Sequence, residues 1–319
     1  MNHMKKVLAP LANWVIEYSP APIQRYFRKR SEKRRIQKIK ERFQRIKISK
    51  EEISSLVNLL SLNCDVFLHS STTNIGKIDG GTKFLSELIL NKVDITKHTL
   101  LAIASPCIES KDFQYIKSSL DIRTAAVTQG MINEYLALKP EACRSCNPTH
   151  SVIAIGPDAN WYTGEHYKDM TPFSIHSPFY KLIERNAKIL LFGVPLQNTT
   201  FCHVIEDLFF PDFPRNPYRN KLFRVHAVDQ NGIAHEMVVR ASRRLPHNCK
   251  IEWILPYLNR YDVIESYPVG ESALYVLNVK RLVRAYCQAL LDGWSVYGKF
   301  KPTSRLLERV NAYMEKLNG

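Results

Sequence analysis

Residues 188–207 read KILLFGVPLQNTTFCHVIED and contain, in succession, a strand, a turn and the start of a helix. The apolar run KILLF is typical of a strand that is buried on both faces. Gly193 and Pro195 mark the point at which the chain leaves the sheet. A strand that leads directly into a helix is the repeating unit of an α/β fold.

The same unit occurs elsewhere in the chain. Short apolar runs predict further strands, and periodicity of three and four residues predicts further helices. After residue 207, prolines interrupt the pattern, and two β-rich runs flank Asn231-Gly232 as in a hairpin. We expect strands at 65–69, 99–104, 151–155 and 188–194, helices at 82–90 and 279–291, and a hairpin region at 207–250.

The positive charge of the chain is concentrated near its N-terminus. The 319 residues include 45 Lys+Arg and 30 Asp+Glu, a net charge of +15. Residues 1–50 hold 15 of the bases and three of the acids, so they carry +12 and leave +3 for residues 51–319. A nucleic-acid enzyme would be expected to carry positive charge along its working groove. We therefore expect no nucleic-acid partner.

Two apolar stripes lie within this basic segment at helical spacing. One interpretation is an anchor that contacts an anionic membrane at its inner face, because Trp14 and a basic face suit a lipid headgroup layer. The other is a helix that packs on its own domain or on a second subunit, which leaves a homo-oligomer open. The stripe residues are Leu8, Leu11, Trp14, Val15 and Tyr18, followed by Ile36, Ile39, Phe43 and Ile46.

The remaining composition favours a cytoplasmic protein. No apolar run reaches the length of a membrane-spanning helix, and the N-terminus lacks the pattern of a signal peptide. The seven cysteines are scattered and odd in number, which predicts reduced thiols rather than a disulfide framework. We expect no metal, since Cys143, Cys146 and His150 have no second ligand pair at zinc spacing.

The first segment with chemical potential is DVFLHSSTTNIGKIDGGTKFLSELIL, residues 65–90. Ser70 and Ser71 follow a strand, and Gly76, Gly80 and Gly81 lie before or at the start of a helix. Such a loop can approach and bind phosphate oxygens. It can also be an ordinary connection, because it matches neither the Walker A motif nor the dinucleotide fingerprint.

Two further segments place histidines beside polar turns. His150 stands just before the strand at 151–155, where an imidazole can act as a base near neutral pH or serve structure alone. His203 and Glu206 share one face of the helix in the opening segment, so Glu206 or Asp207 can orient an imidazole, or the pair can lie on the surface. The chain has no G-x-S-x-G element, which disfavours serine hydrolysis.

Taken together, these segments resemble the aminoglycoside 3-N-acetyltransferase family, which is unrelated to the common GNAT acetyltransferases. The resemblance covers about residues 52–292. It implies an antibiotic acetyltransferase fold: a central mixed sheet flanked by helices, with a smaller inserted region. The blocks that carry it are HSS to GG (69–81), LDIRT (120–124), RSCNPTHSVIAIGPDA (144–159), SPFYKLIERNAKILLFGVPLQNTTFCHVIED (177–207) and VGESA (269–273).

The resemblance implies acetyl-CoA-dependent transfer to an amine within a ternary complex, without a metal. His150 matches the histidine that helps to deprotonate the acceptor, and Glu206 matches its carboxylate partner. The residues that the resemblance places near coenzyme A are Ser70, Ser71, Gly76, Gly80 and Gly81 in the first loop, with Asn198 and Thr199 beside the thioester. The expected organisation is a basic amphipathic helical extension at 1–50, an acetyltransferase domain at 51–300 with 207–250 on its substrate side, and a C-terminal helix at 301–319.

The chain also departs from the family pattern. Asn147 stands where the family's His-Pro-x-His-Ser element has its first histidine, and the nearly neutral body is not rich in the acids that a polycationic drug would require. We therefore expect the acceptor to be an amino sugar, nucleotide-linked or lipid-linked, in bacterial surface-polysaccharide biosynthesis. The alternatives are an aminoglycoside acetyltransferase that confers antibiotic resistance, and a catalytically silent member that docks on a membrane or a partner.

Overall fold

The computed structural model describes residues 37, 41, 43–106, 119–242 and 249–318. Most of the predicted extension at residues 1–50, including its first apolar stripe, lies outside them. Strand β1 (Lys47–Ile48) pairs in parallel with β3 (Lys77–Ile78), so the end of this segment is part of the folded body. No helix in the described ranges is long and apolar enough to cross a membrane.

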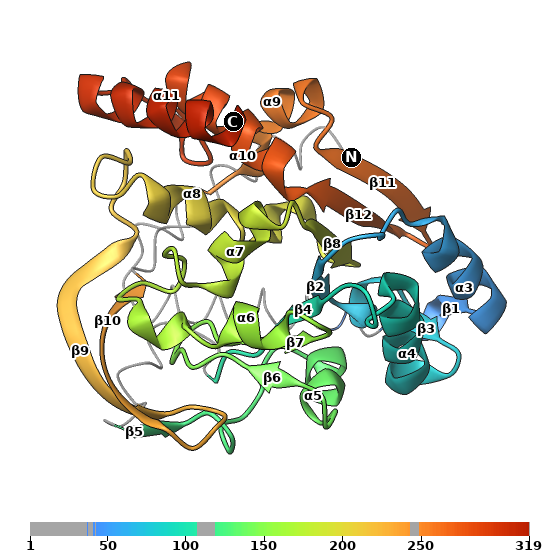
Figure 1. The fold of residues 1–319 in the computed structure, drawn as a ribbon. Helices are drawn as coiled ribbons and strands as arrows, with labels where there is room; N and C mark the ends of the chain where they lie inside the picture. Colours follow the sequence, from blue (N-terminus) through green and yellow to red (C-terminus); the bar gives the residue numbers. More distant parts are fainter. Residues whose placement is uncertain (1–36, 38–40, 42, 107–118, 243–248, 319) are drawn as a thin grey trace.

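A seven-stranded mixed sheet forms the centre of the molecule (Figure 1), in the order β11-β12-β8-β2-β4-β7-β6. Strands β8, β2 and β4 are parallel, whereas β12 and β7 run antiparallel on either side of them. This arrangement confirms the predicted central mixed sheet. Its strands are β2 (Val66–Ser70), β4 (Leu100–Ile103), β6 (Cys143–Arg144), β7 (Val152–Ile155), β8 (Lys188–Phe192), β11 (Ile264–Val269) and β12 (Ser272–Asn278).

Helices cover both faces of this sheet because its central strands are apolar on both sides. In β2, Phe67 belongs to the core on one face and Leu68 to the core on the other. One face carries α3 (Lys50–Leu59), α4 (Gly81–Val93) and α5 (Met131–Ala137). The other carries α6 (Ala159–Thr163), α7 (Pro178–Glu184), α8 (Cys202–Leu208), α9 (Leu255–Arg260), α10 (Val279–Leu291) and α11 (Ser304–Asn318).

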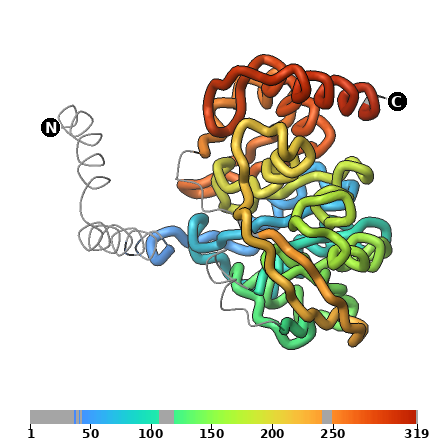
Figure 2. The backbone as a smooth tube through the Cα atoms, turned by 90° about the vertical axis from the view of Figure 1, so that its left-hand side faces the viewer, coloured from blue at the N-terminus to red at the C-terminus, as the bar shows by residue number. Residues whose placement is uncertain are grey.

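A second sheet of three strands forms the smaller inserted region. Its order is β10-β9-β5, from β5 (Ser119–Asp121), β9 (Tyr218–Val228) and β10 (Ala234–Ser242). The long β9–β10 ribbon runs along one flank of the body (Figure 2), and its turn at Asn231-Gly232 agrees with the predicted hairpin. The remaining elements are β13 (Trp294–Ser295), β14 (Gly298–Lys299), η1 (Thr72–Asn74), η3 (His166–Lys168), η4 (Leu196–Asn198) and η5 (Ile251–Trp253).

Several strand ends meet at one edge of the large sheet. The parallel strands β2, β4 and β8 all end there, and Ser70 pairs with Phe192 at the ends of β2 and β8. The antiparallel strand β7 begins at the same edge, where the Ala104 amide donates to the Ser151 carbonyl across 2.7 Å. The edge therefore gathers the loop after β2, the turn after β8 and the turn before β7.

Candidate active site

His150 is held by a polar turn before β7. The side-chain oxygen Oδ1 of Asn147 accepts hydrogen bonds from the amides of Thr149 and His150 and from the Thr149 hydroxyl, at 2.9–3.1 Å. Asn147 is buried, so these bonds are sheltered from water. The turn forms here because an asparagine side chain can bond backbone amides two and three residues ahead.

This turn also determines which nitrogen of His150 is protonated. Nδ1 of His150 lies 3.0 Å from Oγ1 of Thr149, and that hydroxyl gives its own proton to Asn147. Oγ1 must therefore accept from His150, so Nδ1 carries the proton and Nε2 keeps its lone pair. Burial lowers the pKa of His150 to about 3, and the nearby His203 and His166 act in the same direction. His150 is thus a neutral imidazole near pH 7.

His203 has the opposite electrostatic surroundings. Its Nδ1 lies 2.9 Å from Oε2 of Glu206, as the predicted spacing on one face of α8 requires. Glu206 has no exposed surface, whereas the side chain of His203 is 42% exposed. Burial alone would lower the pKa of His203, but the charge of Glu206 and its hydrogen bond together raise it.

Glu206 has a second partner that the sequence pattern did not indicate. The hydroxyl of Tyr297 donates to Oε1 of Glu206 across 3.0 Å. In the described part of the chain, no hydrogen bond joins Glu206 to His150, the residue with which the resemblance paired it. The carboxylate therefore bonds His203 on one oxygen and Tyr297 on the other.

Phe173 brings the two histidines into one site. Its ring centroid lies 4.9 Å from that of His150 and 5.5 Å from that of His203, and it packs on Phe179 at 5.0 Å. Sequence reasoning missed Phe173, because the loop at 164–177 has neither strand nor helix periodicity. Only the tertiary fold places this ring against imidazoles from the turn before β7 and from α8.

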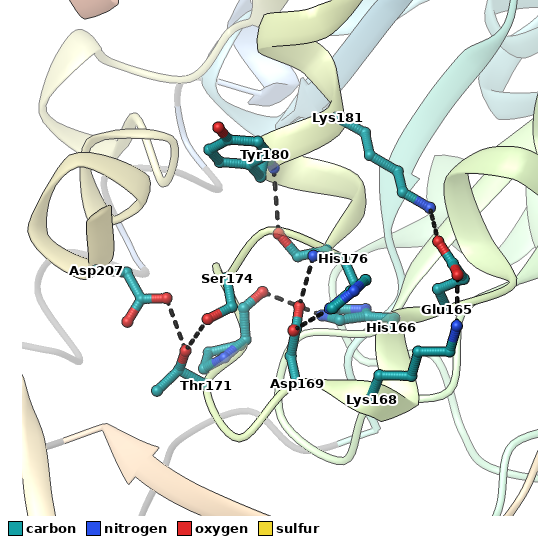
Figure 3. Close-up of polar contacts among 12 residues, drawn as sticks. Glu165, His166, Lys168, Asp169, Thr171, Ser174, His176, Tyr180, Lys181 and Asp207 are labelled. Atoms are coloured by element: carbon teal, nitrogen blue, oxygen red, sulfur yellow. Dashed lines mark hydrogen bonds and ion pairs between the residues drawn. The ribbon is translucent and has the colours of Figure 1, made fainter. Parts of the chain in front are cut away.

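Asp207 fixes the loop that carries Phe173. Thr171 donates to Oδ2 of Asp207 across 2.6 Å, and Ser174 lies 2.9 Å from the same hydroxyl (Figure 3). The other oxygen, Oδ1, accepts from Tyr218 of β9 across 2.7 Å. Burial raises the pKa of Asp207, with these hydrogen bonds acting against it. Between the two carboxylates that could orient an imidazole, Glu206 does so and Asp207 holds the loop.

Two other buried histidines differ in their hydrogen bonding, since both ring nitrogens of His166 are bonded whereas the buried Nε2 of His69 has no hydrogen-bond partner. In His166, Nε2 bonds the Pro172 carbonyl at 3.0 Å and Nδ1 bonds Ser145 at 2.8 Å, so both nitrogens are used. His69, near the end of β2, packs against Phe67 at 5.0 Å. Burial lowers the pKa of His166 to about 3 and that of His69 to about 4.

The loop after β2 and the turn after β8 lie against each other. The Ser71 amide donates to the Phe192 carbonyl across 2.8 Å, and Nδ2 of Asn74 donates to the Gly193 carbonyl across 3.0 Å. A Cβ on Gly193 would lie 2.6 Å from the Ser71 carbonyl oxygen, so this close approach requires glycine. Ser70 and Ser71 are therefore brought to the edge at which η4 begins.

Asn198 and Thr199, the two residues at the η4 turn that were predicted to lie near the thioester, differ in their exposure to solvent. Thr199 is buried and its hydroxyl donates to the Leu196 carbonyl across 2.7 Å, which closes the η4 turn. The Asn198 side chain is exposed at the same turn. Thr199 thus shapes the turn, while Asn198 remains accessible to a ligand.

The three glycines of the first loop differ in what surrounds them. A Cβ on Gly76 would collide with Ile46, and one on Gly80 would collide with Phe84 and Lys50. Both glycines therefore have a packing role. Gly81 begins α4 with open space beside it.

The described residues contain no group of three or more His, Cys, Asp or Glu that could hold a metal ion. Cys143 bonds Asn160 at 3.2 Å, and burial raises the pKa of Cys146 to about 12. The six cysteines in the described ranges are free thiols.

Comparison with known proteins identifies the family. The sequence model described as aminoglycoside 3-N-acetyltransferase matches residues 67–290, which is more than half of the chain. The chain belongs to the aminoglycoside 3-N-acetyltransferase family. His150, Phe173, His203 and Glu206 lie within the matched residues, whereas Tyr297 lies beyond them.

Individual members of the family are distant in sequence. Aminoglycoside N(3)-acetyltransferase III of Serratia marcescens is 27% identical over 154 residues, which cover 44% of this chain and 56% of that protein. Aminoglycoside N(3)-acetyltransferase IX of Micromonospora chalcea is 28% identical over 157 residues, which cover 45% and 55%. The chain spans about half the length of the curated relatives that it matches.

Solved structures of the family share the fold over a longer range. Aminoglycoside acetyltransferase AAC(3)-Xa matches with a TM-score of 0.61 at 18% identity, over 79% of this chain and 95% of that one. The structure titled AAC-IIIb binary with CoASH matches with a TM-score of 0.58 at 16% identity, over 85% and 97%. These matches confirm the predicted antibiotic acetyltransferase fold.

Proposed function

We propose that this protein is an acetyl-CoA-dependent N-acetyltransferase that acylates an amine of an aminoglycoside. The observation that carries the proposal is the pair of imidazoles on Phe173, one neutral and one backed by Glu206, at the edge where the parallel strands end. Family membership and the relatives named as N-acetyltransferases support the reaction class.

The two imidazoles divide the work of deprotonation in this proposal. An amine is protonated near neutral pH and must lose a proton before it can attack a thioester. His150 accepts a hydrogen bond from the amine through the lone pair on Nε2. His203 is the stronger base because Glu206 stabilises its charged form, and it takes the proton at Nε2.

The acyl transfer then proceeds directly between the two substrates. The amine lone pair forms a bond to the thioester carbonyl carbon, and the resulting tetrahedral species collapses with cleavage of the carbon–sulfur bond. The departing thiolate receives a proton, for which protonated His203 is the donor. The nitrogen loses two protons in all: one is released to solvent, and the other passes through His203 to the thiolate. The products are an N-acetyl amide, coenzyme A and one proton, and the enzyme returns to its starting protonation state.

Acetyl-CoA is the acyl donor in the proposal, as the family and a relative's structure with CoASH support. Ser70 and Ser71 after β2 and Asn198 in η4 are proposed to contact it, because their loops lie side by side at the site edge. Gly81 supplies an open position at the start of α4, where free amides favour phosphate. Gly76, Gly80 and Thr199 support these loops through packing and the η4 turn.

The acceptor in this proposal differs from the one that charge alone favoured. Relatives named as aminoglycoside N(3)-acetyltransferases support an aminoglycoside. The comparisons do not support a surface-polysaccharide amino sugar, a nucleotide or lipid linkage, or membrane contact through residues 1–50.

The proposal is tested by coenzyme A release in the presence of acetyl-CoA. Acceptors from the gentamicin and neomycin classes are compared with UDP-linked 4-amino sugars, and products are identified by mass spectrometry. We expect acetylation of at least one aminoglycoside class with kcat/KM above that of every nucleotide sugar. Turnover of the nucleotide sugars alone would reverse the acceptor assignment, and binding of coenzyme A without any turnover would favour the silent-member alternative.

A further inference from the structure

Tyr297, which lies outside the family-matched residues, donates the second hydrogen bond that Glu206 accepts. Its hydroxyl contacts Oε1 at 3.0 Å, while His203 contacts Oε2 at 2.9 Å. Glu206 is fully buried, so water does not compete for either oxygen. Because the two donors approach different oxygens, together they restrict rotation of the carboxylate about its terminal bond.

The tyrosine is itself held in place. It lies in the turn between β13 and β14, where its amide donates to Oγ of Ser295 across 3.2 Å. The preceding amide of Val296 donates to the buried hydroxyl of Tyr286 on α10 across 3.3 Å. The guanidinium of Arg215 stacks on the Tyr297 ring at 5.0 Å. The phenol therefore reaches Glu206 from a turn that Tyr286 of α10 and Arg215 contact from outside.

We propose that Tyr297 is a positioning residue for the His203–Glu206 pair. Its hydroxyl keeps the carboxylate turned toward Nδ1 of His203, so that Nε2 of this histidine faces the acceptor amine. The effect on turnover rests on the proposed function, whereas the effect on the pair does not. The family match ends at residue 290, so this part of the pair's support comes from a segment outside it.

Removal of the hydroxyl has a defined electrostatic consequence. Oε1 of Glu206 would become a buried oxygen without a donor, which penalises the charged carboxylate. The carboxylate would also be free to turn away from Nδ1 of His203. Both changes weaken the attraction that keeps the proton on His203, so the pKa of His203 falls.

Other ionisable groups around the pair come from several elements. The thiols and phenols among them have pKa values raised by burial and stay neutral near pH 7. The charge of the site is therefore set by Glu206, Asp207, His203 and the guanidinium of Arg215 over the Tyr297 ring, while His150 is neutral. The groups that face Glu206 are Cys202, His203 and Asp207 on α8, Tyr218 on β9, Cys249 before η5, Tyr286 on α10 and Tyr297, and His150 faces His203.

The test is an NMR titration of the His203 ring in the full chain, assigned with His203→Gln. Tyr297→Phe removes only the hydroxyl. Tyr267→Phe is the matched control, because Tyr267 also donates to a glutamate, Glu265, across 2.8 Å but on the exposed strand β11. We expect Tyr297→Phe to lower the pKa of His203 by about one unit, and Tyr267→Phe to leave it unchanged.

Two further measurements separate positioning from a general loss of structure. In a Glu206→Gln background, Tyr297→Phe should have no additional effect on His203, because the pair is already broken. In the acetyl-transfer assay, kcat of Tyr297→Phe should fall about tenfold with KM unchanged, as for an interaction made through the base.

An unchanged pKa of His203 in Tyr297→Phe would overturn the proposal, as would an equal shift in the Glu206→Gln background. Absence of acetyl transfer by the wild-type chain would instead contradict the proposed function. The titration would then still decide whether Tyr297 positions the pair.

Discussion

His150 and His203 contact the same phenylalanine but differ in what lies behind each ring. Nδ1 of His150 bonds a neutral hydroxyl, that of Thr149, whereas Nδ1 of His203 bonds the carboxylate of Glu206. Burial therefore determines the pKa of His150 and lowers it, while the carboxylate outweighs burial at His203 and raises it. Burial, together with the charge of the group bonded to Nδ1, thus sets whether an imidazole in this site is neutral or readily protonated.

The unequal basicity of His150 and His203 suits the proposed chemistry. Two equal bases would compete for one proton, whereas unequal bases can divide recognition of the amine from acceptance of its proton. The sheet edge supplies both kinds of surroundings because the turn before β7 and helix α8 reach Phe173 from separate parts of the chain.

The largest expected effect comes from removing the carboxylate behind His203. Glu206→Gln should lower kcat by roughly 10²–10⁴, the contribution of general-base catalysis. His203→Gln should cost about as much, and the double variant no more than either, because the two side chains act as a unit. Steady-state kinetics on the three variants measures this. Additive losses would show that Glu206 acts independently of His203.

Removal of the imidazole of His150 should lower turnover by a similar factor while leaving coenzyme A binding intact. His150→Ala is expected to retain coenzyme A binding, measured by calorimetry, and to lose turnover by roughly 10²–10⁴. Its effect should multiply only in part with that of Glu206→Gln, since His150 and His203 share Phe173 and act on the same amine. Wild-type turnover in His150→Ala would leave His203 as the sole base.

Phe173→Ala removes the aromatic ring that contacts both histidines. Loss of a buried phenylalanine should lower the free energy of unfolding by about 3–5 kcal/mol and shift the titration of both rings. Phe209→Ala is the matched control, since Phe209 is equally buried but packs on Tyr313 of α11. Denaturant unfolding should show similar losses, whereas NMR should show shifted histidines in Phe173→Ala alone.

A substitution at Asn147 can place a carboxylate near His150, as Glu206 does for His203, with a smaller expected effect. Asn147→Asp places a carboxylate at the start of the hydrogen-bonded turn that includes Thr149, so the pKa of His150 should rise. Asn147→Ala removes the acceptor and should cost about 1–3 kcal/mol of unfolding free energy, with no rise in that pKa. Titration and denaturant unfolding of the two variants check both statements. An unchanged pKa of His150 in Asn147→Asp would contradict the conclusion that this turn controls the protonation of His150.

In the pH dependence of stability, the two histidines should have opposite signs. An unfolded histidine has a pKa of about 6.5, so His150 at about 3 makes the fold lose stability as pH falls below about 6.5. The raised pKa of His203 contributes stability that is complete below about 6.5 and is lost as pH rises through the folded value. His150→Gln should therefore flatten the acid side of the stability profile, and His203→Gln the neutral side.

Much of the scaffold of the site could be predicted from local patterns. The helix predicted at 279–291 agrees with α10, the hairpin about Asn231-Gly232 is observed, and His203 and Glu206 share a face of α8 as their spacing indicates. Local patterns succeed here because helix periodicity and turn chemistry depend on neighbours within a few residues. The roles of Ser70, Ser71 and Asn198 toward coenzyme A remain predictions.

Long-range contacts were not predictable in this way. The loop at 164–177 and the turn at Tyr297 have no periodic signal, yet they supply the ring between the histidines and the second donor to Glu206. Gly76 was expected near a ligand because of its loop, but packing against Ile46 accounts for it in the structure.

By itself, the sequence determined the alternation of strands and helices, the position of the hairpin, the concentration of charge in residues 1–50 and the face shared by His203 and Glu206. These are properties of composition and of residues close together in the chain. Only the tertiary structure decided that Glu206 bonds His203 and Tyr297, that Asp207 holds the loop of Phe173, and that Asn147 sets the protonated nitrogen of His150. A pKa depends on burial and on charges brought together by the fold, so the difference between the two histidines exists only once the sheet edge has formed.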